Sequence, residues 1–234
     1  CACLVGSEMC IRDRGKNKEA QELCGPTICS PSANGMPYQT VGSLHLDFDG
    51  ISNYNDYYRD LDIAKAIATT RFTTNGVTYT REAYTSFPDQ VLVIRLTASQ
   101  KKSISFTAKY TTPYKSNVVR SISSRKELQL SGKANDHEGI EGKVEFTALT
   151  RIENNGGSLE ATSDSTLQVK NANSVTLYVS IGTNFVNYKD VSGNALSTAQ
   201  KYLKQVNKNY AKNKAAHILS LIHISEPTRH AQIS

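Results

Sequence analysis

Chemistry in this chain would rest on its acidic side chains and on the histidines close to them. Asp136, His137 and Glu138 are consecutive. His45 precedes Asp47 by two positions. Groups of these types can coordinate a metal ion or exchange protons as general acid and base. The first cluster lies in a glycine-flanked polar segment without further ligands beside it, which indicates a mobile loop. The second shares the polar face of a predicted strand, which indicates a solvent-facing pair.

Paired carboxylates hydrolyse glycosidic bonds when they lie about 5–5.5 Å or about 6.5–9.5 Å apart, depending on the mechanism. Nothing in the sequence sets such a distance, so we interpret the acidic residues of the predicted strands and turns as solvated or turn-capping groups: Asp47, Asp49, Asp60, Asp62, Glu82 and Asp89. Some tyrosines could stack on sugar rings, although in a sandwich they more often cover sheet edges: Tyr54, Tyr57, Tyr58 and Tyr84. No phosphate loop, nucleophile elbow or zinc motif is present, so we predict no metal site and no cofactor.

The element that the sequence defines best is a β-hairpin. Asn75 and Gly76 suit the two central positions of a type I′ turn, because both positions need a positive φ angle. Counting outward from this turn pairs Phe72 with Tyr79 on one face. Such an aromatic pair stabilises a hairpin by about 0.2–1 kcal/mol relative to two alanines. The hairpin therefore has a predicted register as well as a predicted turn.

Alternating apolar and polar residues predict further short strands, separated by turn-forming residues: 44–48, 58–63, 103–110, 128–130, 144–152, 167–169 and 175–179. The run 91–96 is apolar on both faces, which predicts a central strand covered on both sides. The whole pattern predicts an all-β fold, a large antiparallel β-sandwich over residues 36–192.

The period of the apolar residues changes near residue 193. They now recur at three- and four-residue steps, which predicts one amphipathic linker helix over residues 193–218: Leu196, Ala199, Leu203, Val206 and Tyr210. Ser197 and Gln200 have the spacing of a capping box at the start of this helix. The apolar face predicts that the helix packs on the sandwich or on a further domain.

Both ends of the chain have an unusual origin. One DNA sequence, read in opposite orientations, can encode both residues 3–14 (CLVGSEMCIRDR) and residues 219–229 (LSLIHISEPTR). This DNA resembles a transposase-type sequencing adapter, so we interpret residues 1–14 and 219–234 as adapter-derived ends of an assembled gene fragment. The native chain is then 15–218, truncated at both ends, and a missing signal peptide says nothing about compartment.

The native chain begins with the end of a helix, to Cys24, and a loop, which together occupy residues 15–35. Cys24 and Cys29 are its only cysteines, and their spacing leaves a disulfide and two free thiols both open, with free thiols the simpler interpretation. The formal net charge of +6 is spread along the chain without a basic block. This argues against a nucleic-acid partner, which would need clustered basic residues. We also predict no membrane-spanning segment.

Several ordered blocks carry a family resemblance: MPYQTVGSLHLDF at 36–48, YYRDLDIAKAIATTRFTTNGVTYTREAYTSFPDQVLVIRL at 57–96, EGKVEFTA at 141–148 and the stretch 183–190. Together they closely resemble the N-terminal domain of glycoside hydrolase family 95, the α-L-fucosidases. The resemblance covers essentially all of the native chain. The run YAKNKAAHI at 210–218 resembles the linker that enters the catalytic domain of that family.

The resemblance implies an inverting hydrolase that removes terminal α-linked L-fucose, notably α-1,2-linked, from glycans. It implies a super-sandwich type of β-sandwich here and an (α/α)6 catalytic barrel downstream. The catalytic carboxylates would lie beyond Ile218, so no catalytic residue is assigned and the chain alone is expected to be inactive. The expected partners are a fucosylated glycan and the chain's own catalytic domain, in a secreted or periplasmic bacterial protein. Tyr38 and Gln39, just before the first strand, are predicted to lie near the substrate or the domain interface.

Two other functions are compatible with a tyrosine-rich sandwich. The chain could be a stand-alone carbohydrate-binding module, which predicts measurable binding to fucosylated oligosaccharides. It could also be a surface adhesin domain, which predicts tandem sandwiches rather than a helical barrel in the flanking DNA.

Overall fold

The computed structural model describes residues 14–28, 38–48, 50–51, 53–114, 118–123 and 127–225. The chain forms two compact units, one of residues 1–39 with 135–142 and one of residues 40–134 with 143–234. The first unit contains helix α2 (Asn17–Ile28). This helix continues past Cys24 through Pro26, which was expected to lie in the loop. Pro26 has no amide proton and removes one helical hydrogen bond, and the helix ends two residues later. Cys29 lies outside the described residues.

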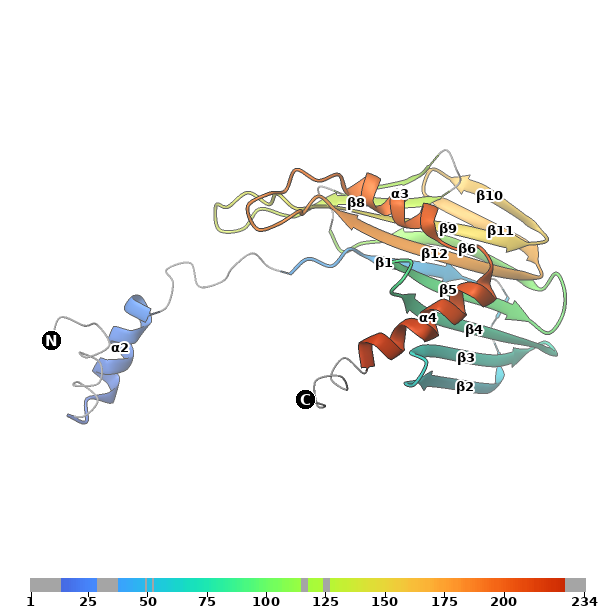
Figure 1. Ribbon diagram of the computed structural model, residues 1–234, viewed down its shortest axis with the longest axis horizontal. Helices are drawn as coiled ribbons and strands as arrows, with labels where there is room; N and C mark the ends of the chain where they lie inside the picture. Colours follow the sequence, from blue (N-terminus) through green and yellow to red (C-terminus); the bar gives the residue numbers. More distant parts are fainter. Residues whose placement is uncertain are drawn as a thin grey trace, which may run out of the picture. The chain divides into compact units, whose positions relative to one another are not determined.

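The second unit is built from two antiparallel β-sheets, so the predicted all-β sandwich is confirmed (Figure 1). The small sheet has the strand order β1 (Ser43–Asp47), β6 (Ile104–Thr111), β11 (Thr166–Ala172) and β10 (Ser158–Ser163). The large sheet has the strand order β2 (Asn55–Asp62), β3 (Ile67–Thr74), β4 (Val77–Ser86), β5 (Val91–Ala98), β12 (Ser174–Thr183), β9 (Glu145–Asn155), β8 (Leu128–Lys133) and β7 (Val118–Ile122).

The hairpin between β3 and β4 has the predicted turn and register. Asn75 and Gly76 have φ angles of 50° and 75°, as a type I′ turn requires. Phe72 is the cross-strand partner of Tyr79, and their rings stack with centroids 5.4 Å apart and an interplanar angle of 17°. A local signal was sufficient here because the turn itself determines which residues face each other.

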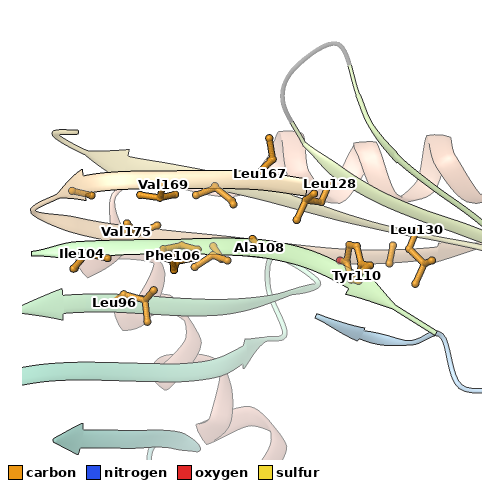
Figure 2. Close-up of a cluster of buried hydrophobic side chains, with 14 of the residues drawn as sticks. Leu96, Ile104, Phe106, Ala108, Tyr110, Leu128, Leu130, Leu167, Val169 and Val175 are labelled. Carbon is orange, nitrogen blue, oxygen red and sulfur yellow. The ribbon is translucent and has the colours of Figure 1, made fainter. Parts of the chain in front are cut away.

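The main core lies between the two sheets (Figure 2). Ile104, Phe106 and Ala108 of β6 are almost completely buried, as the alternating pattern predicted. They pack against buried residues of the large sheet, including Leu96 and Val175. Burying such side chains is the main stabilising contribution to a sandwich, at about 25 cal/mol per Å² of apolar surface.

A second core lies on the other face of the large sheet, under the C-terminal helices. Val93 of β5 is completely buried there, whereas Leu96 of the same strand packs between the sheets. The prediction of a central strand covered on both faces is thus confirmed. Ala199 and Leu203 of α3 (Ala195–Gln205) are buried against this face. Of the two packing partners predicted for the C-terminal helix, the structure shows the sandwich.

The predicted single helix is two helices, α3 and α4 (Tyr210–Ser225). The backbone leaves the helical region at Val206, which has a ψ angle of 127°. Asn209 then starts α4, because its side-chain oxygen accepts a hydrogen bond from the backbone N–H of Lys212 at 3.2 Å. The apolar spacing continues across this break and therefore concealed it. Helix α4 extends to Ser225, seven residues past the predicted end at 218.

The predicted capping box of α3 is wrong. Asn194 is the N-cap, and its side-chain oxygen accepts a hydrogen bond from the backbone N–H of Ser197 at 2.7 Å. Asparagine fills this role as well as serine does. Two strands were missed: β7 is only five residues long, and β10 is mostly polar. The strand β8 continues to Lys133, past its predicted end at residue 130.

Candidate functional site

The two residues predicted to lie near a substrate or an interface, Tyr38 and Gln39, both belong to the smaller unit. The Tyr38 side chain is fully exposed. The Gln39 side-chain oxygen accepts a hydrogen bond from the backbone N–H of Asn135 at 3.1 Å. The Gln39 side-chain nitrogen is buried and has no hydrogen-bond partner among the described residues. The Gln39–Asn135 hydrogen bond connects the segment before β1 to the 135–142 loop. A role of Tyr38 and Gln39 near a substrate stays a prediction.

His45 and Asp47 lie on the exposed face of β1, as predicted, and each has its own partner on β6. His45 Nε2 lies 2.7 Å from the Thr111 hydroxyl. Asp47 Oδ2 lies 2.8 Å from Lys109 Nζ, and this hydrogen bond lowers the pKa of the carboxyl group below its usual value. The pair therefore serves strand pairing, and a group that stays ionised this way is a poor general acid.

The Asp136–Glu138 cluster forms a small turn closed by paired backbone hydrogen bonds between His137 and Ile140. His137 Nε2 lies 3.7 Å from Glu138 Oε1, and Asp136 accepts a hydrogen bond from the backbone N–H of Gly142 at 2.9 Å. Across the described parts of the chain, no group of three or more His, Cys, Asp or Glu side chains is arranged to hold a metal ion.

Glu82 joins β4 to α4. Its carboxylate accepts hydrogen bonds from the Tyr210 hydroxyl at 2.8 Å and from Lys214 Nζ at 2.6 Å. Burial alone would raise the pKa of Glu82, but these two hydrogen bonds outweigh it and hold the pKa below its usual value. Burial and the same carboxylate raise the pKa of the Tyr210 hydroxyl. The Arg95 guanidinium lies over the Tyr210 ring, 5.2 Å from its centroid.

A second group of hydrogen bonds, next to those of Glu82, also connects α4 to the sheet. The buried Tyr84 hydroxyl donates a hydrogen bond to the Asn213 side-chain oxygen at 2.7 Å. The Asn213 side-chain nitrogen donates to Asp89 at 2.8 Å, and Asp89 also accepts from the Ser86 hydroxyl at 2.6 Å. Asp89 Oδ2 thus connects the helix to the β4–β5 turn.

His217 of α4 is buried and stacks on the Tyr84 ring at a centroid distance of 4.6 Å. Its Nε2 lies 2.9 Å from the Lys65 carbonyl oxygen. Because a carbonyl only accepts, Nε2 donates the hydrogen bond, and Nδ1 is buried without a hydrogen-bond partner among the described residues. The sequence could have shown this polar face of α4, since residues 210, 213, 214 and 217 recur at helical steps.

A groove of about 550 Å³ lies on the inner face of β2, β3 and β4, and we call it the β2–β4 groove. Tyr54, Tyr57 and Phe72 line it, with ring centroids 5.7 Å and 6.2 Å from Tyr54. Arg59 and Arg81 also line it. Of the other tyrosines considered for sugar stacking, Tyr58 lies under Arg71 outside this groove and Tyr84 is buried. The two arginines were not singled out from the sequence.

An apolar hollow of about 590 Å³ lies where β4, β5 and β12 meet at one end of the large sheet. Phe87 and Ile181 line it and are exposed. The loop after β12 exposes Phe185, Val186 and Tyr188 as well. We call the exposed hollow lined by Phe87 and Ile181 the strand-end surface. Exposed apolar side chains that line one hollow are typical of surfaces that contact another body.

Among the described carboxylates, those of Asp47, Asp62, Glu82 and Asp89 are each held by nearby cations, hydroxyls or amides. Asp62 is bonded to Lys65 at 2.7 Å, Asp60 is exposed on β2, and Asp49 lies outside the described residues. No described helix combines the length and apolar character needed to cross a membrane.

Comparison with known proteins identifies the domain. The family model for the glycosyl hydrolase family 65 N-terminal domain matches residues 11–188. The chain is 28% identical over 178 residues to alpha-L-fucosidase 2 of Arabidopsis thaliana, covering 65% of this chain and 21% of that protein. It is 26% identical over 151 residues to probable alpha-fucosidase A of Aspergillus oryzae, covering 63% and 20%. The chain thus spans about a fifth of the length of these curated relatives.

A putative kojibiose phosphorylase from the human microbiome aligns in three dimensions with a TM-score of 0.45 and 15% identity, over 73% of this chain and 25% of that one. The sequence match covers most of the chain, including every strand from β1 to β12. The chain belongs to the family of glycosyl hydrolase family 65 N-terminal domains.

Proposed function

We propose that this chain is the non-catalytic N-terminal domain of an inverting α-L-fucosidase of glycoside hydrolase family 95. At full length, the enzyme would hydrolyse terminal α-linked L-fucose, notably α-1,2-linked, from glycans. The observation that carries the proposal is the match to two proteins named as fucosidases over 151–178 residues, within a region that also matches a hydrolase N-terminal domain. The sequence blocks that resemble family 95 support the narrower assignment.

The contacts of the carboxylates favour a structural role for this domain over a catalytic one. Glu82 and Asp89 are engaged in fixing α4 to the sheet, and Asp47 pairs with Lys109. The strand-end surface offers exposed apolar side chains that a catalytic domain in the same polypeptide would cover. In this proposal, residues 15–218 are the native segment and α4 leads into an (α/α)6 barrel.

The test is to recover the gene on both sides of this segment from the source DNA and to express the extended protein beside the present chain. We expect the extended protein alone to release fucose from 2′-fucosyllactose, with the β-anomer appearing first by NMR because the mechanism inverts. The proposal fails if the downstream sequence encodes no helical barrel, or if the extended, folded protein releases no fucose.

A second function, a carbohydrate-binding module, is favoured by one observation, the three aromatic rings of the β2–β4 groove. Calorimetric titration of the present chain with 2′-fucosyllactose tests it. Binding that is lost in Tyr54→Ala and kept in Tyr58→Ala, whose ring lies outside the groove, would support this alternative. A flat titration would exclude it for fucosylated ligands.

A further inference from the structure

The two sheets of the sandwich have unequal numbers of strands. Within the described residues, the large sheet has eight strands and the small sheet four. The strand β1 ends the small sheet, while β2, β3 and β4 extend the large sheet beyond it (Figure 1). Among the described residues no strand faces the inner side of β2, and the β2–β4 groove occupies this place. A sandwich sheet normally buries its inner face against a second sheet, so this half of the sandwich is open.

Among the described strands, β1 is paired along one edge only, and its other edge is on the side of the groove. In the described part of the chain it pairs with β6 alone, from Ser43 opposite Thr111 to Asp47 opposite Thr107. Phe48, the next residue, lies 5.3 Å from the Phe106 ring and 5.5 Å from the Arg81 guanidinium on β4. The end of β1 therefore lies over β4. An unpaired strand edge presents backbone N–H and C=O groups that pair readily with a further strand.

The groove is not only apolar. Arg81 Nε is buried without a hydrogen-bond partner among the described residues. Arg59 lines the same groove, and within the described part of the chain neither guanidinium forms an ion pair with a carboxylate. Burial lowers the pKa of Arg81, which reflects the cost of keeping its charge away from water. A guanidinium in such a place is stabilised by a carboxylate that accepts its planar set of donors.

We propose that a further extended segment of the same polypeptide fills the β2–β4 groove, adds to the free edge of β1 and places an Asp or Glu side chain against Arg81 and Arg59. This segment belongs to the longer protein, so the inference rests on the proposed function, in which the present chain is a fragment. Its inward-facing residues are apolar where they meet Phe72, Ala68 and Ala83. A strand satisfies the edge, the apolar surface and the unpaired charge together, whereas a soluble sugar would leave the β1 edge unpaired.

Hydrogen exchange tests the inference on the wild-type proteins. The amides of β1, and those of β2 to β4, are compared between the 234-residue chain and the extended protein recovered from the source DNA. We expect the β1 edge amides to exchange about tenfold or more slowly in the extended protein, because pairing protects them. Equal exchange of β1 in the two proteins would overturn the inference.

Arg81→Met provides an independent test of the charge. In the 234-residue chain it removes an unpaired, half-buried cation, so we expect an unchanged or raised melting temperature. In the extended protein the same substitution leaves the opposing carboxylate without its cation, so we expect a lowered melting temperature. The matched control is Arg71→Met, whose guanidinium lies over Tyr58 on the other face of β3 and should behave alike in both proteins. A drop for Arg81→Met in both proteins, or in neither, would contradict the proposed carboxylate.

A fucosidase assay on the same extended protein separates this inference from the proposed function. Fucose release by a protein whose β1 edge amides are not protected would contradict only the inference of an added strand. Protection of the β1 edge amides without fucose release would contradict only the fucosidase proposal.

Discussion

At the scale of single residues, Glu82 holds α4 on the sheet, and this contact is pH-dependent. Its pKa is lowered in the folded protein, so it contributes stability that is present above its unfolded pKa of about 4.3 and is lost as the pH falls through the folded value. We predict that the amides of α4 exchange faster as the pH is lowered below about 4, after correction for the intrinsic exchange rate.

Glu82→Gln is the control for this pH effect, because it keeps the shape of the side chain and removes its titration. The variant should show weaker protection of α4 near neutral pH and a flatter dependence on acid. An acid dependence as steep as that of the wild-type protein would assign the effect to another carboxyl group.

Alanine substitutions at two turn glycines, Gly76 and Gly157, distinguish the cost of backbone strain from the cost of steric overlap. Gly76 has a φ angle of 75° and an added Cβ would meet open space, so Gly76→Ala should cost only the left-handed conformation, about 1–2 kcal/mol. Gly157 has a φ angle of 67°, and its Cβ would overlap the Lys170 carbonyl oxygen as well. We predict that Gly157→Ala is clearly more destabilising than Gly76→Ala in urea unfolding. Equal losses would mean that the β10–β11 region relaxes freely.

The spacing of its polar residues could have shown the polar face of α4, but not which residues of the sheet it contacts. Tyr84 bonds Asn213 from 129 residues away, and Asp89 bonds the same side chain from 124 residues away. Sequence patterns identified Asp89 as a turn residue and Tyr84 as a strand residue, but nothing local relates either to the helix. Contacts of this kind depend on the complete fold, whereas the Phe72–Tyr79 pair depends on a two-residue turn.

At the scale of elements, one buried ion pair connects α3 to the large sheet. Arg151 donates to Glu127 at 2.7 and 2.8 Å and to the Leu203 carbonyl oxygen at 2.8 Å. The Glu127 side chain is 4% exposed. Arg151→Met should therefore destabilise the protein by about 3–5 kcal/mol, because it leaves a buried carboxylate uncompensated.

Two variants check this assignment by chemical denaturation. The double variant Glu127→Leu with Arg151→Met should recover most of the loss, since no charge is then stranded. Lys208→Met breaks the exposed pair with Glu153 and should cost about 0–1 kcal/mol. A double variant as unstable as Arg151→Met alone would show that lost packing, and not the stranded charge, causes the effect.

Element boundaries were predicted well where a turn residue interrupts an alternating pattern and poorly where polarity is uniform. The Gly156-Gly157 turn between β9 and β10 was expected, and both residues have positive φ angles. The strand β10 itself was missed because its exposed residues do not alternate. The break between α3 and α4 was missed because Val206 and Tyr210 keep the helical spacing on both sides of it.

At the scale of the whole molecule, the strand-end surface predicts self-association. The apolar face of α3, which would be exposed if the helix lacked a partner, is instead buried, since Leu203 is 1% exposed. Phe87 and Ile181 remain exposed at 62% and 49%. We predict a concentration-dependent mass above the 25.7 kDa monomer in size-exclusion chromatography with light scattering.

The matched variants locate this association. Phe87→Ser with Ile181→Thr should return the protein to the monomer mass, whereas Val119→Ser, which removes an exposed apolar residue from β7 at the sheet edge, should not. A wild-type chain that stays monomeric across the concentration series would refute the prediction.

The position of β12 has a consequence for how the protein folds. Strands β2 to β5 join neighbours in sequence, and so do β7 to β9, but only β12 joins these two halves of the large sheet, pairing with β5 and β9. A growing chain therefore carries two incomplete half-sheets with open edges until residue 183 has left the ribosome. Non-local closure of this kind is slow and exposes strand edges to aggregation. Any fragment that stops before β12 is thus expected to require a chaperone, however stable its hairpins are.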